Sequence, residues 1–314
     1  MEQLRYGILS TSSIAPRFID AVRQAQAGDI LALSSRTLEK ARERAALWSI
    51  PTAYGSHEAL LADERINIVY ISTVNALHYT WAKAALEHGK HVVCEKPCTT
   101  TEEQTRELFR LAEKKGLFFM EAQKMLLLPA IVALKEKLDA GVLGQVTMAD
   151  MRHSFPATYN NWMLDPAAGG GTLLSSGIYV TELLSRLFGN ISQIKVSAVT
   201  AENGLEQQYI LTGFAGNVQF CAQNSSLSML DNTLRIGGSK GWIEIPEYWK
   251  ARKLLLYLPP APPEVLEFPC ENELVYEAKH IYECITGGFL TSPVVTEEIT
   301  LAGIRALQVV KTDW

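Results

Sequence analysis

The chain has 314 residues, of which 47% are apolar and 20% are charged, so it can bury the core of one large or two ordinary domains. Its net charge of -5 excludes the basic surplus that is typical of a general nucleic-acid-binding protein. No window of about 18 residues is free of charge, and the first residues show no basic stretch followed by an apolar one. We therefore expect no membrane span, no secretory signal and a cytoplasmic location.

The first part of the chain alternates short apolar runs with helical patterns, as a parallel sheet with crossover helices requires. We expect strands at residues 4–9, 29–34, 66–72, 90–94 and 117–120, and a short extended piece at 53–54. We expect helices at residues 13–23, 37–48, 78–87 and 101–116, and one more that begins at Ser56. Thr37, Ser56 and Thr101 are the expected helix caps. This pattern predicts an α/β fold that opens with a doubly wound Rossmann domain over residues 1–122.

The second part of the chain, residues 123–314, has mostly the period-two pattern of strands. The expected strands are residues 145–152, 194–200, 207–212, 218–223, 233–236, 242–245 and 254–258. Helices are expected after Pro129, after the glycine run at 169–171, and near 273–286 and 297–311. Turn signals such as residues 237–241 (GGSKG) favour antiparallel pairing. We predict an α+β domain with a large, mostly antiparallel sheet.

The cysteines are few and scattered, at Cys94, Cys98, Cys221, Cys270 and Cys284. Their odd number, in a chain without an expected secretory signal, indicates reduced thiols. Cys94 and Cys98 lie four residues apart, but no second pair of Cys or His stands nearby at the spacing of zinc ligands. We therefore expect small buried side chains and predict no metal site.

The turn between the first strand and the first helix is the expected pyrophosphate site, because helix N-terminal amides attract phosphate. In register with the G-x-G-x-x-G/A pattern, its three positions are Ser10, Ser12 and Ala15. A serine Cβ hinders the close approach that glycine allows, although a run of hydroxyl groups can itself contact phosphate. An ordinary Ser or Thr helix cap fits the local sequence equally well. The predicted cofactor contacts here are Ser10, Thr11, Ser12, Ser13 and Ile14.

The end of the second expected strand determines which dinucleotide is preferred. Sites that select NAD usually have an Asp or Glu there to hold the ribose 2′-hydroxyl. This chain has Ser35 and Arg36 instead, with Lys40 one turn later, and a guanidinium group suits a 2′-phosphate. A solvated arginine at a helix start is the alternative. We predict cofactor contacts from Ser35 and Arg36, and NADP in preference to NAD.

Two stretches resemble the signature of the glucose-fructose oxidoreductase, inositol dehydrogenase and rhizopine-catabolism (Gfo/Idh/MocA) family: residues 71–78 (ISTVNALH) and 89–97 (GKHVVCEKP). Within this family the chain most resembles the dimeric dihydrodiol dehydrogenase branch. The resemblance covers nearly the whole chain, including residues 120–129, 143–144, 169–171, 177–179 and 276–280. The Glu-Lys-Pro run at this position is fairly specific, whereas glycine-rich loops alone are not. The resemblance implies an NAD(P)-dependent oxidoreductase.

The resemblance further implies that Lys96 reaches the substrate hydroxyl or carbonyl beside the nicotinamide. The carboxyl end of a parallel strand is where such sheets bind ligands, and Pro97 can fix the lysine's backbone, as a trans or a cis peptide. A cationic nicotinamide nearby would help the amine to lose its proton, as a base requires. Tyr179 stands at the family's second catalytic position and can share this acid–base role. A core aromatic packed with Leu183 on one helix face is the alternative.

Further site residues follow from the same resemblance. The implied cofactor contacts are Thr73, Asn75, His78, Glu95 and Lys96 itself. Asn75 would lie near the nicotinamide ribose, whereas His78 fits a helix start better than a catalyst. The candidate substrate contacts are His153, Trp162 and Ser175, with Asn161 beside them. Trp162 fits an apolar wall for a ring and a structural aromatic equally well.

Four positions depart from the family's pattern. Ser10 and Ser12 replace glycines, Ser175 replaces an Asp, and Leu126 replaces an Arg. A serine can hydrogen-bond a substrate hydroxyl, but it cannot carry the charge that tunes a neighbouring acid or base. These departures leave the substrate open, and they also fit a protein that binds nucleotide but turns over slowly or not at all.

We therefore predict an NADP(H)-dependent oxidoreductase that acts on the CH–OH carbon of a sugar, cyclic polyol or dihydrodiol. The rival hypothesis is a nucleotide- or sugar-sensing regulator with little or no activity, and a third is a reductase of a larger conjugated substrate. By resemblance, we expect a homodimer that forms through the open face of the C-terminal sheet. Four apolar residues fit either that face or an internal core: Val218, Phe220, Trp242 and Ile243.

Overall fold

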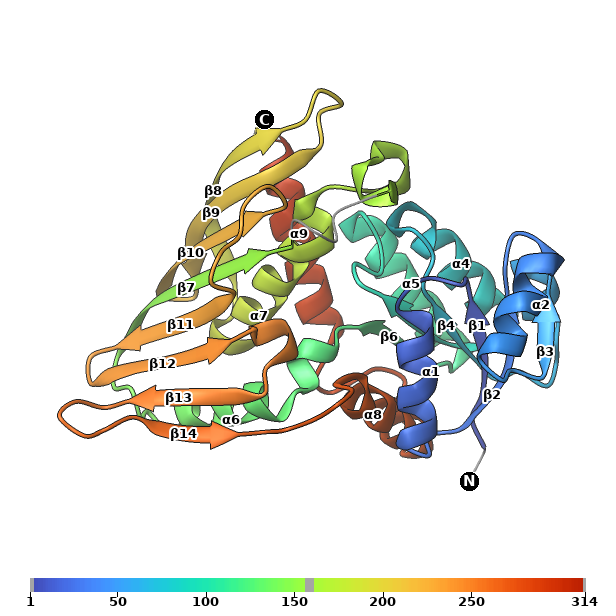
Figure 1. The fold of residues 1–314 in the computed structure, drawn as a ribbon, viewed down its shortest axis with the longest axis horizontal. Helices are drawn as coiled ribbons and strands as arrows, with labels where there is room; N and C mark the ends of the chain where they lie inside the picture. Colours follow the sequence, from blue (N-terminus) through green and yellow to red (C-terminus); the bar gives the residue numbers. More distant parts are fainter. Residues whose placement is uncertain (1–2, 156–160, 313–314) are drawn as a thin grey trace. The chain divides into compact units, whose positions relative to one another are not determined.

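The computed structural model describes residues 3–155 and 161–312, which fold into two compact units (Figure 1). The first unit comprises Met1–Gln123 and Asn272–Glu297, and the second comprises Lys124–Glu271 and Glu298–Trp314. The sequence predicts a single division, after residue 122, whereas the structure groups the later segment 272–297 with the first unit. Among the helices formed by the described residues, none has both the length and the apolar character that a membrane crossing needs.

A six-stranded parallel sheet forms the centre of the first unit. Its strands are β1 (Arg5–Leu9), β2 (Asp29–Ser34), β3 (Thr52–Tyr54), β4 (Ile68–Ile71), β5 (His91–Glu95) and β6 (Phe119–Ala122). They lie in the order β3-β2-β1-β4-β5-β6, and every neighbouring pair is parallel. The helices of this unit are α1 (Ala15–Gln24), α2 (Leu38–Leu47), α3 (His57–Leu61), α4 (Asn75–Glu87), α5 (Glu102–Lys115) and α8 (Leu274–Thr286). This strand order confirms the predicted Rossmann fold.

Local side-chain chemistry sets several helix ends in the first unit. The side chains of Thr37, Ser56 and Thr101 each accept a backbone N–H three residues on, and they cap α2, α3 and α5. At the other end of α5, Gly116 has a φ of 67°, a left-handed conformation that glycine adopts without steric cost. The helix caps expected from the sequence are therefore confirmed.

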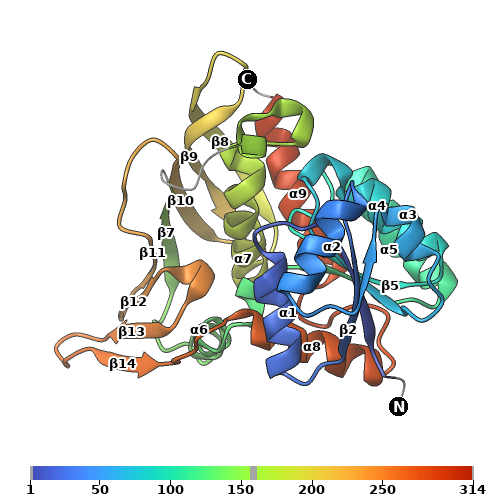
Figure 2. The same ribbon diagram turned by 45° about the vertical axis from the view of Figure 1, so that its right-hand side comes forward.

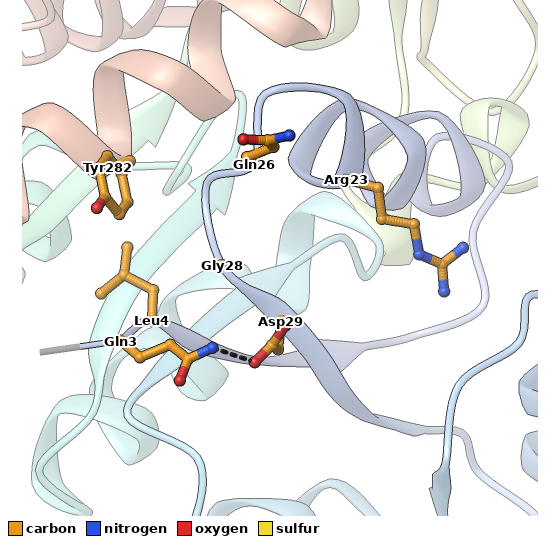
Figure 3. Close-up of a pocket in the computed structure, with 7 residues that line it drawn as sticks. All are labelled: Gln3, Leu4, Arg23, Gln26, Gly28, Asp29 and Tyr282. Carbon is orange, nitrogen blue, oxygen red and sulfur yellow. Dashed lines mark hydrogen bonds between the residues drawn. The ribbon is translucent and has the colours of Figure 1, made fainter.

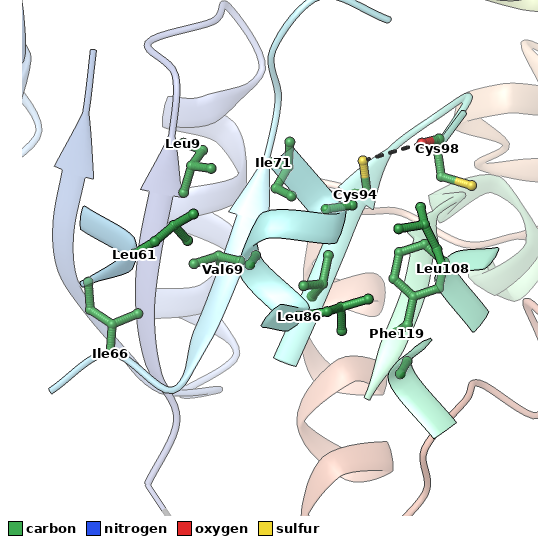
Figure 4. Packing of buried hydrophobic residues seen from close by; sticks show 14 of the residues in the cluster. Leu9, Leu61, Ile66, Val69, Ile71, Leu86, Cys94, Cys98, Leu108 and Phe119 are labelled. Atoms are coloured by element: carbon green, nitrogen blue, oxygen red, sulfur yellow. Dashed lines mark hydrogen bonds between the residues drawn. The ribbon is translucent and has the colours of Figure 1, made fainter. Parts of the chain in front are cut away.

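Apolar side chains fill the space between the parallel sheet and the helices (Figure 4). All four residues of β4 are buried, as expected for a strand that is covered on both faces. On one face, Val69 and Cys94 of the sheet pack in the same cluster as Leu86 of α4 and Leu108 of α5. Burial raises the pKa of the Cys94 thiol well above its ordinary value, so this cysteine acts as a small apolar side chain.

The segment Asn272–Glu297 joins the first unit through specific contacts. The Arg17 guanidinium on α1 lies 2.6 Å from the carboxylate of Glu273, which is almost fully buried. The Asn272 side chain donates a 2.8 Å hydrogen bond to the Arg17 carbonyl oxygen. Further on, Phe119 of β6 donates to the Leu290 carbonyl oxygen at 3.0 Å. Helix α8 is therefore part of the Rossmann unit, although it follows the other domain's sheet in the sequence.

An eight-stranded sheet forms the second unit. Its strands are β7 (Val146–Ser154), β8 (Ile191–Thr200), β9 (Glu206–Ala215), β10 (Val218–Ser225), β11 (Thr233–Gly238), β12 (Gly241–Pro246), β13 (Lys253–Tyr257) and β14 (Glu264–Glu267). Their order is β14-β13-β12-β11-β7-β10-β9-β8, and only β7 and β10 pair in parallel. The mostly antiparallel sheet that the sequence predicts is confirmed, with β14 added at its edge.

Three long helices, α6 (Pro129–Asp139), α7 (Ile178–Phe188) and α9 (Glu297–Thr312), lie along one face of this sheet (Figures 1 and 2). Short helical turns complete the unit: η1 (Lys124–Leu127), η2 (Asn161–Leu164), η3 (Pro166–Ala168), η4 (Leu173–Gly177) and η5 (Tyr248–Lys250). Val218, Phe220 and Ile243 are buried, so for these three the internal-core alternative holds. Trp242 is exposed and stacks on Tyr257 with 4.5 Å between ring centroids.

Candidate active site

The turn after β1 keeps a glycine-like backbone although it contains serines. Ser10 has a φ of 90°, a conformation that L-residues rarely adopt and glycine adopts readily. The backbone N–H of Ser10 donates to the Ser34 carbonyl oxygen at 3.1 Å, and the Ser12 hydroxyl donates to the Ser72 hydroxyl at 2.8 Å. These contacts connect the turn to the ends of β2 and β4, the two strands that lie on either side of β1.

The helix cap proposed as the alternative for this turn is not what the structure has. Helix α1 begins after Ile14, and among the described residues no side chain accepts a hydrogen bond from its first N–H groups. Pro16 stands in the first turn, where its missing N–H costs nothing. The local geometry therefore fits an anion held by backbone amides better than a helix capped by its own serine.

The carboxyl end of β2 carries the predicted ribose-site residues. Ser34 and Ser35 are buried, and Arg36 is exposed directly before the cap of α2. The Ser34 hydroxyl lies 2.7 Å from Nδ1 of His57, a residue that the sequence analysis did not select. Burial lowers the pKa of His57. The structure thus anchors the serines inside the fold and leaves the Arg36 guanidinium at the surface.

The ends of β4 and β5 are linked by a buried histidine. His78, in the first turn of α4, is 1% exposed. Its Nε2 lies 3.0 Å from the Thr73 carbonyl oxygen and its Nδ1 lies 2.8 Å from that of Pro97. Burial is the largest effect on this imidazole and lowers its pKa, against the opposing effect of the two carbonyls. These contacts hold His78 between the ends of the two strands, and neighbouring Asn75 is buried as well.

Lys96 follows β5 at the carboxyl edge of the sheet. The preceding Glu95 accepts a hydrogen bond from the buried Tyr70 hydroxyl, and its other oxygen lies 3.3 Å from the Lys96 backbone nitrogen. Tyr70 stacks on Phe18 of α1 with 3.7 Å between ring centroids. The Lys96–Pro97 peptide bond is cis. Lys96 itself is half-buried.

In the first unit, the residues predicted to contact the cofactor thus lie along the carboxyl edge of the parallel sheet. The strand register aligns Leu9 with Ser34 and Ile71, and Ile71 with Cys94. The turns that follow these strand ends contain the predicted residues Ser10 to Ile14, Ser35 and Arg36, Thr73 to His78, and Glu95 and Lys96. Nucleotides bind at this carboxyl edge in doubly wound folds.

In the second unit, Tyr179 is the second residue of α7 and is 8% exposed. The turn before it, η4, is π-helical, and such turns are frequent at functional sites. Ser175 lies in this turn and is buried, and its hydroxyl donates to the Gly171 carbonyl oxygen at 2.7 Å. Leu126, the other departure in this unit, is buried in η1.

An aromatic cluster surrounds His153 beside Tyr179. The His153 ring stacks on Trp249 with 4.0 Å between centroids and lies 6.3 Å from the Tyr179 ring. Phe155 and Tyr248 complete the cluster, at 5.1 and 6.2 Å from His153. His153 and Tyr179 were predicted from the sequence as site residues, whereas their three aromatic neighbours were not. Only the adjacent Tyr-Trp pair at 248–249 offered a signal in the sequence.

Trp162 lies in η2 and is half-buried, while the side chain of Asn161 lies outside the described part of the chain. The first unit contains Lys96 and the second contains Tyr179.

A separate cavity of about 490 Å³ lies at the opposite edge of the parallel sheet (Figure 3). Its described lining is Gln3, Leu4, Arg23, Gln26, Gly28, Asp29 and Tyr282. These residues lie at the amino ends of β1 and β2, at the end of α1 and on α8, and include none of the predicted site residues. This is not the edge at which doubly wound sheets bind nucleotides.

The strand order and the polar turns along the carboxyl edge define a dinucleotide-binding fold. Comparison with protein families agrees with this: residues 4–123 match the oxidoreductase family with an NAD-binding Rossmann fold, and residues 131–244 match the GFO/IDH/MocA C-terminal domain. The chain belongs to the GFO/IDH/MocA family and is an NAD(P)-dependent oxidoreductase.

Its similar proteins include two mammalian trans-1,2-dihydrobenzene-1,2-diol dehydrogenases. The Bos taurus protein is 33% identical over 305 residues, which are 93% of this chain and 91% of the relative. The Mus musculus protein is 33% identical over 303 residues, with the same two coverages. The predicted membership of the GFO/IDH/MocA family, and the predicted resemblance to its dihydrodiol dehydrogenase branch, are therefore confirmed.

Solved structures share the fold at lower identity. Aldose-aldose oxidoreductase from Caulobacter crescentus, complexed with glycerol, has a TM-score of 0.88 at 24% sequence identity. The match covers 99% of this chain and 97% of the Caulobacter crescentus chain. A 3-ketoreductase from Actinomadura kijaniata, in complex with NADP, has a TM-score of 0.89 at 20% identity, covering 99% and 98%. Levoglucosan dehydrogenase, in complex with NADH, has a TM-score of 0.87 at 18% identity, covering 99% and 98%.

Proposed function

We propose that this chain transfers a hydride between NADP(H) and the CH–OH carbon of a dihydrodiol, sugar or cyclic polyol, with Lys96 and Tyr179 as its acid/base residues. The observation that carries the proposal is the Glu95-Lys96-Pro97 turn, held at the carboxyl edge of the Rossmann sheet. The similar mammalian proteins are dihydrodiol dehydrogenases, which supports this class of substrate.

The residues at the carboxyl edge fit a dinucleotide. Ser10 stands at the position of the first glycine in the phosphate-binding pattern and has a positive φ, and the start of α1 lacks a side-chain cap among the described residues. The pyrophosphate would be held by the turn from Ser10 to Ile14, and the ribose end by Ser35 and Arg36. Thr73, Asn75, His78 and Glu95 would border the nicotinamide half. When bound, the nicotinamide supplies the hydride acceptor for oxidation and the donor for reduction.

The acid–base work falls to two side chains. In the oxidation direction, the unprotonated Lys96 amine accepts the proton of the substrate hydroxyl. Tyr179 is the second proposed acid–base group, because a phenol can donate or accept a proton. The aromatic cluster of Phe155, Tyr179 and Trp249 supports a substrate with a ring, because aromatic faces pack against flat or weakly polar ring surfaces.

Preference for NADP is supported by Arg36. This residue is exposed at the end of β2, next to the buried Ser35, where an acid would repel a 2′-phosphate. A guanidinium group donates a planar pair of hydrogen bonds to phosphate. The solved relatives hold NADP in one case and NADH in another, so the choice rests on this chain's own residues.

A homodimer is the assembly that we propose. The face of the eight-stranded sheet opposite α6, α7 and α9 carries apolar side chains, with Met148 56% and Trp242 37% exposed. The strand register sets both beside Gly237, so they belong to one surface. A second copy of the chain, presenting the same surface, would bury them. A cytoplasmic location stays a prediction from the sequence.

The rival hypothesis, a sensing regulator, is favoured by one observation. The Ser175 hydroxyl donates to the backbone at Gly171 and cannot supply the negative charge of an Asp. The two hypotheses differ in turnover, so an activity assay separates them.

The test is NADPH formation, followed at 340 nm, with trans-1,2-dihydrobenzene-1,2-diol, aldoses and cyclic polyols as substrates. We expect turnover of at least one of them, and a loss of about 100-fold or more in kcat for Lys96→Met. Tyr179→Phe should lower kcat less. Binding of NADP without reduction by any substrate, in wild type and variant alike, would support the regulator instead.

A further inference from the structure

One peptide group next to Lys96 is held at both of its polar atoms. The Pro97 carbonyl oxygen lies 2.8 Å from Nδ1 of His78, and the Cys98 backbone N–H donates to Oε1 of Glu121 at 2.7 Å. The carbonyl of residue 97 and the N–H of residue 98 belong to the same planar unit. Two side chains from different elements, α4 and β6, therefore fix the plane that directly follows the Lys96–Pro97 bond.

The contact from Glu121 is unusual in its placement. Glu121 is 1% exposed in the central part of β6, where apolar residues are the rule. The strand register sets it opposite Cys94, four residues before the N–H that it accepts. Pro97 has no N–H, so Cys98 provides the first backbone donor after Lys96. A hydrogen bond to a carboxylate is shorter and about twice as strong as one to a neutral acceptor.

A positioned amine needs a fixed backbone, because a displacement of about 1 Å at an acid/base group can cost about 100-fold in rate. The Cys94 thiol also makes a 3.8 Å contact with the Cys98 carbonyl oxygen (Figure 4). The shorter contacts on this turn are those of His78, Glu121 and Tyr70.

We propose that Glu121 is a positioning residue that acts through the Cys98 amide, together with His78 on the Pro97 carbonyl, to orient Lys96 for proton transfer. The proposal rests on the proposed acid/base role of Lys96. It assigns a purpose to a buried carboxylate that takes no part in the chemistry itself.

The first experiment tests the contact without using activity. Selective ¹⁵N-cysteine labelling gives one backbone amide signal for each of the cysteines at 94, 98, 221, 270 and 284, and Cys98→Ala identifies the signal of interest. We expect the Cys98 amide proton to resonate far downfield and to exchange slowly with solvent in the wild-type protein. Rapid exchange of this amide in the wild-type protein would overturn the proposal, even if no variant folded.

The second experiment measures the consequence. Glu121→Met removes the acceptor at similar length, and Glu121→Gln retains a carbonyl oxygen. We expect Glu121→Met to lower kcat by about 10- to 100-fold, with the KM for dihydrodiol and the Kd for NADP changed by about twofold or less. Glu121→Gln should recover most of the rate. In Glu121→Met the Cys98 amide should move upfield and exchange faster.

Lys90→Met is the matched control. Lys90 precedes the same strand β5, is buried, and donates to the carbonyl oxygens of Asp63 and Ile66 at 2.8 Å each. It is expected to lower stability but to leave kcat and the Cys98 signal as in wild type. Equal losses of kcat in Glu121→Met and Lys90→Met would overturn the positioning role. If Lys96→Met keeps full activity while the Cys98 amide behaves as described, the proposed function fails and the contact stands.

Discussion

Ser10 holds a backbone conformation that glycine adopts more easily. Its φ of 90° places a Cβ where L-residues are strained, yet the turn retains the hydrogen bond from Ser10 to Ser34. The sequence has a serine where the phosphate-binding pattern has a glycine. The structure shows that this serine still has a positive φ. The cost of the replacement therefore appears as strain in the folded chain rather than as a different turn.

Replacing this serine by glycine should relieve that strain. We expect Ser10→Gly to raise the free energy of unfolding by about 1 kcal/mol, after the added flexibility of the unfolded chain is included. Urea unfolding followed by circular dichroism measures the change. Ser13→Gly is the control, because Ser13 does not have a positive φ, and it should be neutral or destabilising. A Ser10→Gly protein that loses as much stability as the control would contradict the strain.

Arg36 provides the residue-level test of cofactor choice. We expect Arg36→Glu to weaken NADP binding by about 10- to 100-fold, because charge-assisted hydrogen bonds are replaced by repulsion. NAD, which lacks the 2′-phosphate, should lose about threefold or less. Isothermal titration calorimetry gives both constants. Arg42→Glu, an exposed site on α2, controls for the general change in charge, and equal losses for NADP and NAD would argue against the assignment.

At the scale of elements, α3 and α4 each bury a histidine against the parallel sheet. Burial lowers the pKa of both His57 and His78 below the usual value of 6.5. Below that pH the unfolded chain binds more protons than the folded chain, so stability falls as the pH is lowered and is fully present above it. Each histidine contributes a slope of at most about 1.4 kcal/mol per pH unit.

Urea unfolding at pH values from 5 to 8 checks this expectation. As far as His57 and His78 determine it, the wild-type free energy of unfolding should change little with pH near neutrality. It should decrease as the pH is lowered into the acid range. His57→Gln should make the decline shallower, since it removes one of the two titrating groups. A decline of the same slope in this variant would show that His57 does not contribute.

The elements differ in how far the sequence could define them. Most helices and strands of the Rossmann unit were predictable, because apolar periodicity and caps such as Thr101 are local signals. The place of α8 was not, since the contacts of Asn272 and Glu273, directly before it, with Arg17 connect residues that are far apart in the chain. The lysine turn was found by resemblance to a family. Tyr248 and Trp249, two of the aromatic neighbours of His153, were missed because no spacing rule links β7 with the short turn η5.

At the scale of the whole molecule, the proposed dimer makes a prediction about mass. Light scattering coupled to gel filtration should give about twice the chain mass of 34.8 kDa. The double variant Met148→Glu with Trp242→Glu should shift the protein to the monomer mass, because it puts charges at the centre of the proposed interface. Val132→Glu, at an exposed apolar position on α6, should leave the mass unchanged. A monomeric wild-type protein would rule out this assembly.

The position of β7 has a consequence for how the larger sheet forms. Strands β8 to β10 and β11 to β14 are two runs of sequential hairpins, and β7, which precedes both in the chain, lies between them. Each run needs only short loops to close, whereas β7 must pair with β10 and β11 across long stretches of sequence. Opening β7 would separate the runs, so its amides should be among the slowest of the sheet to exchange with deuterium, and those of the edge strands β8 and β14 among the fastest. This single strand therefore couples two locally folding halves into one cooperative sheet.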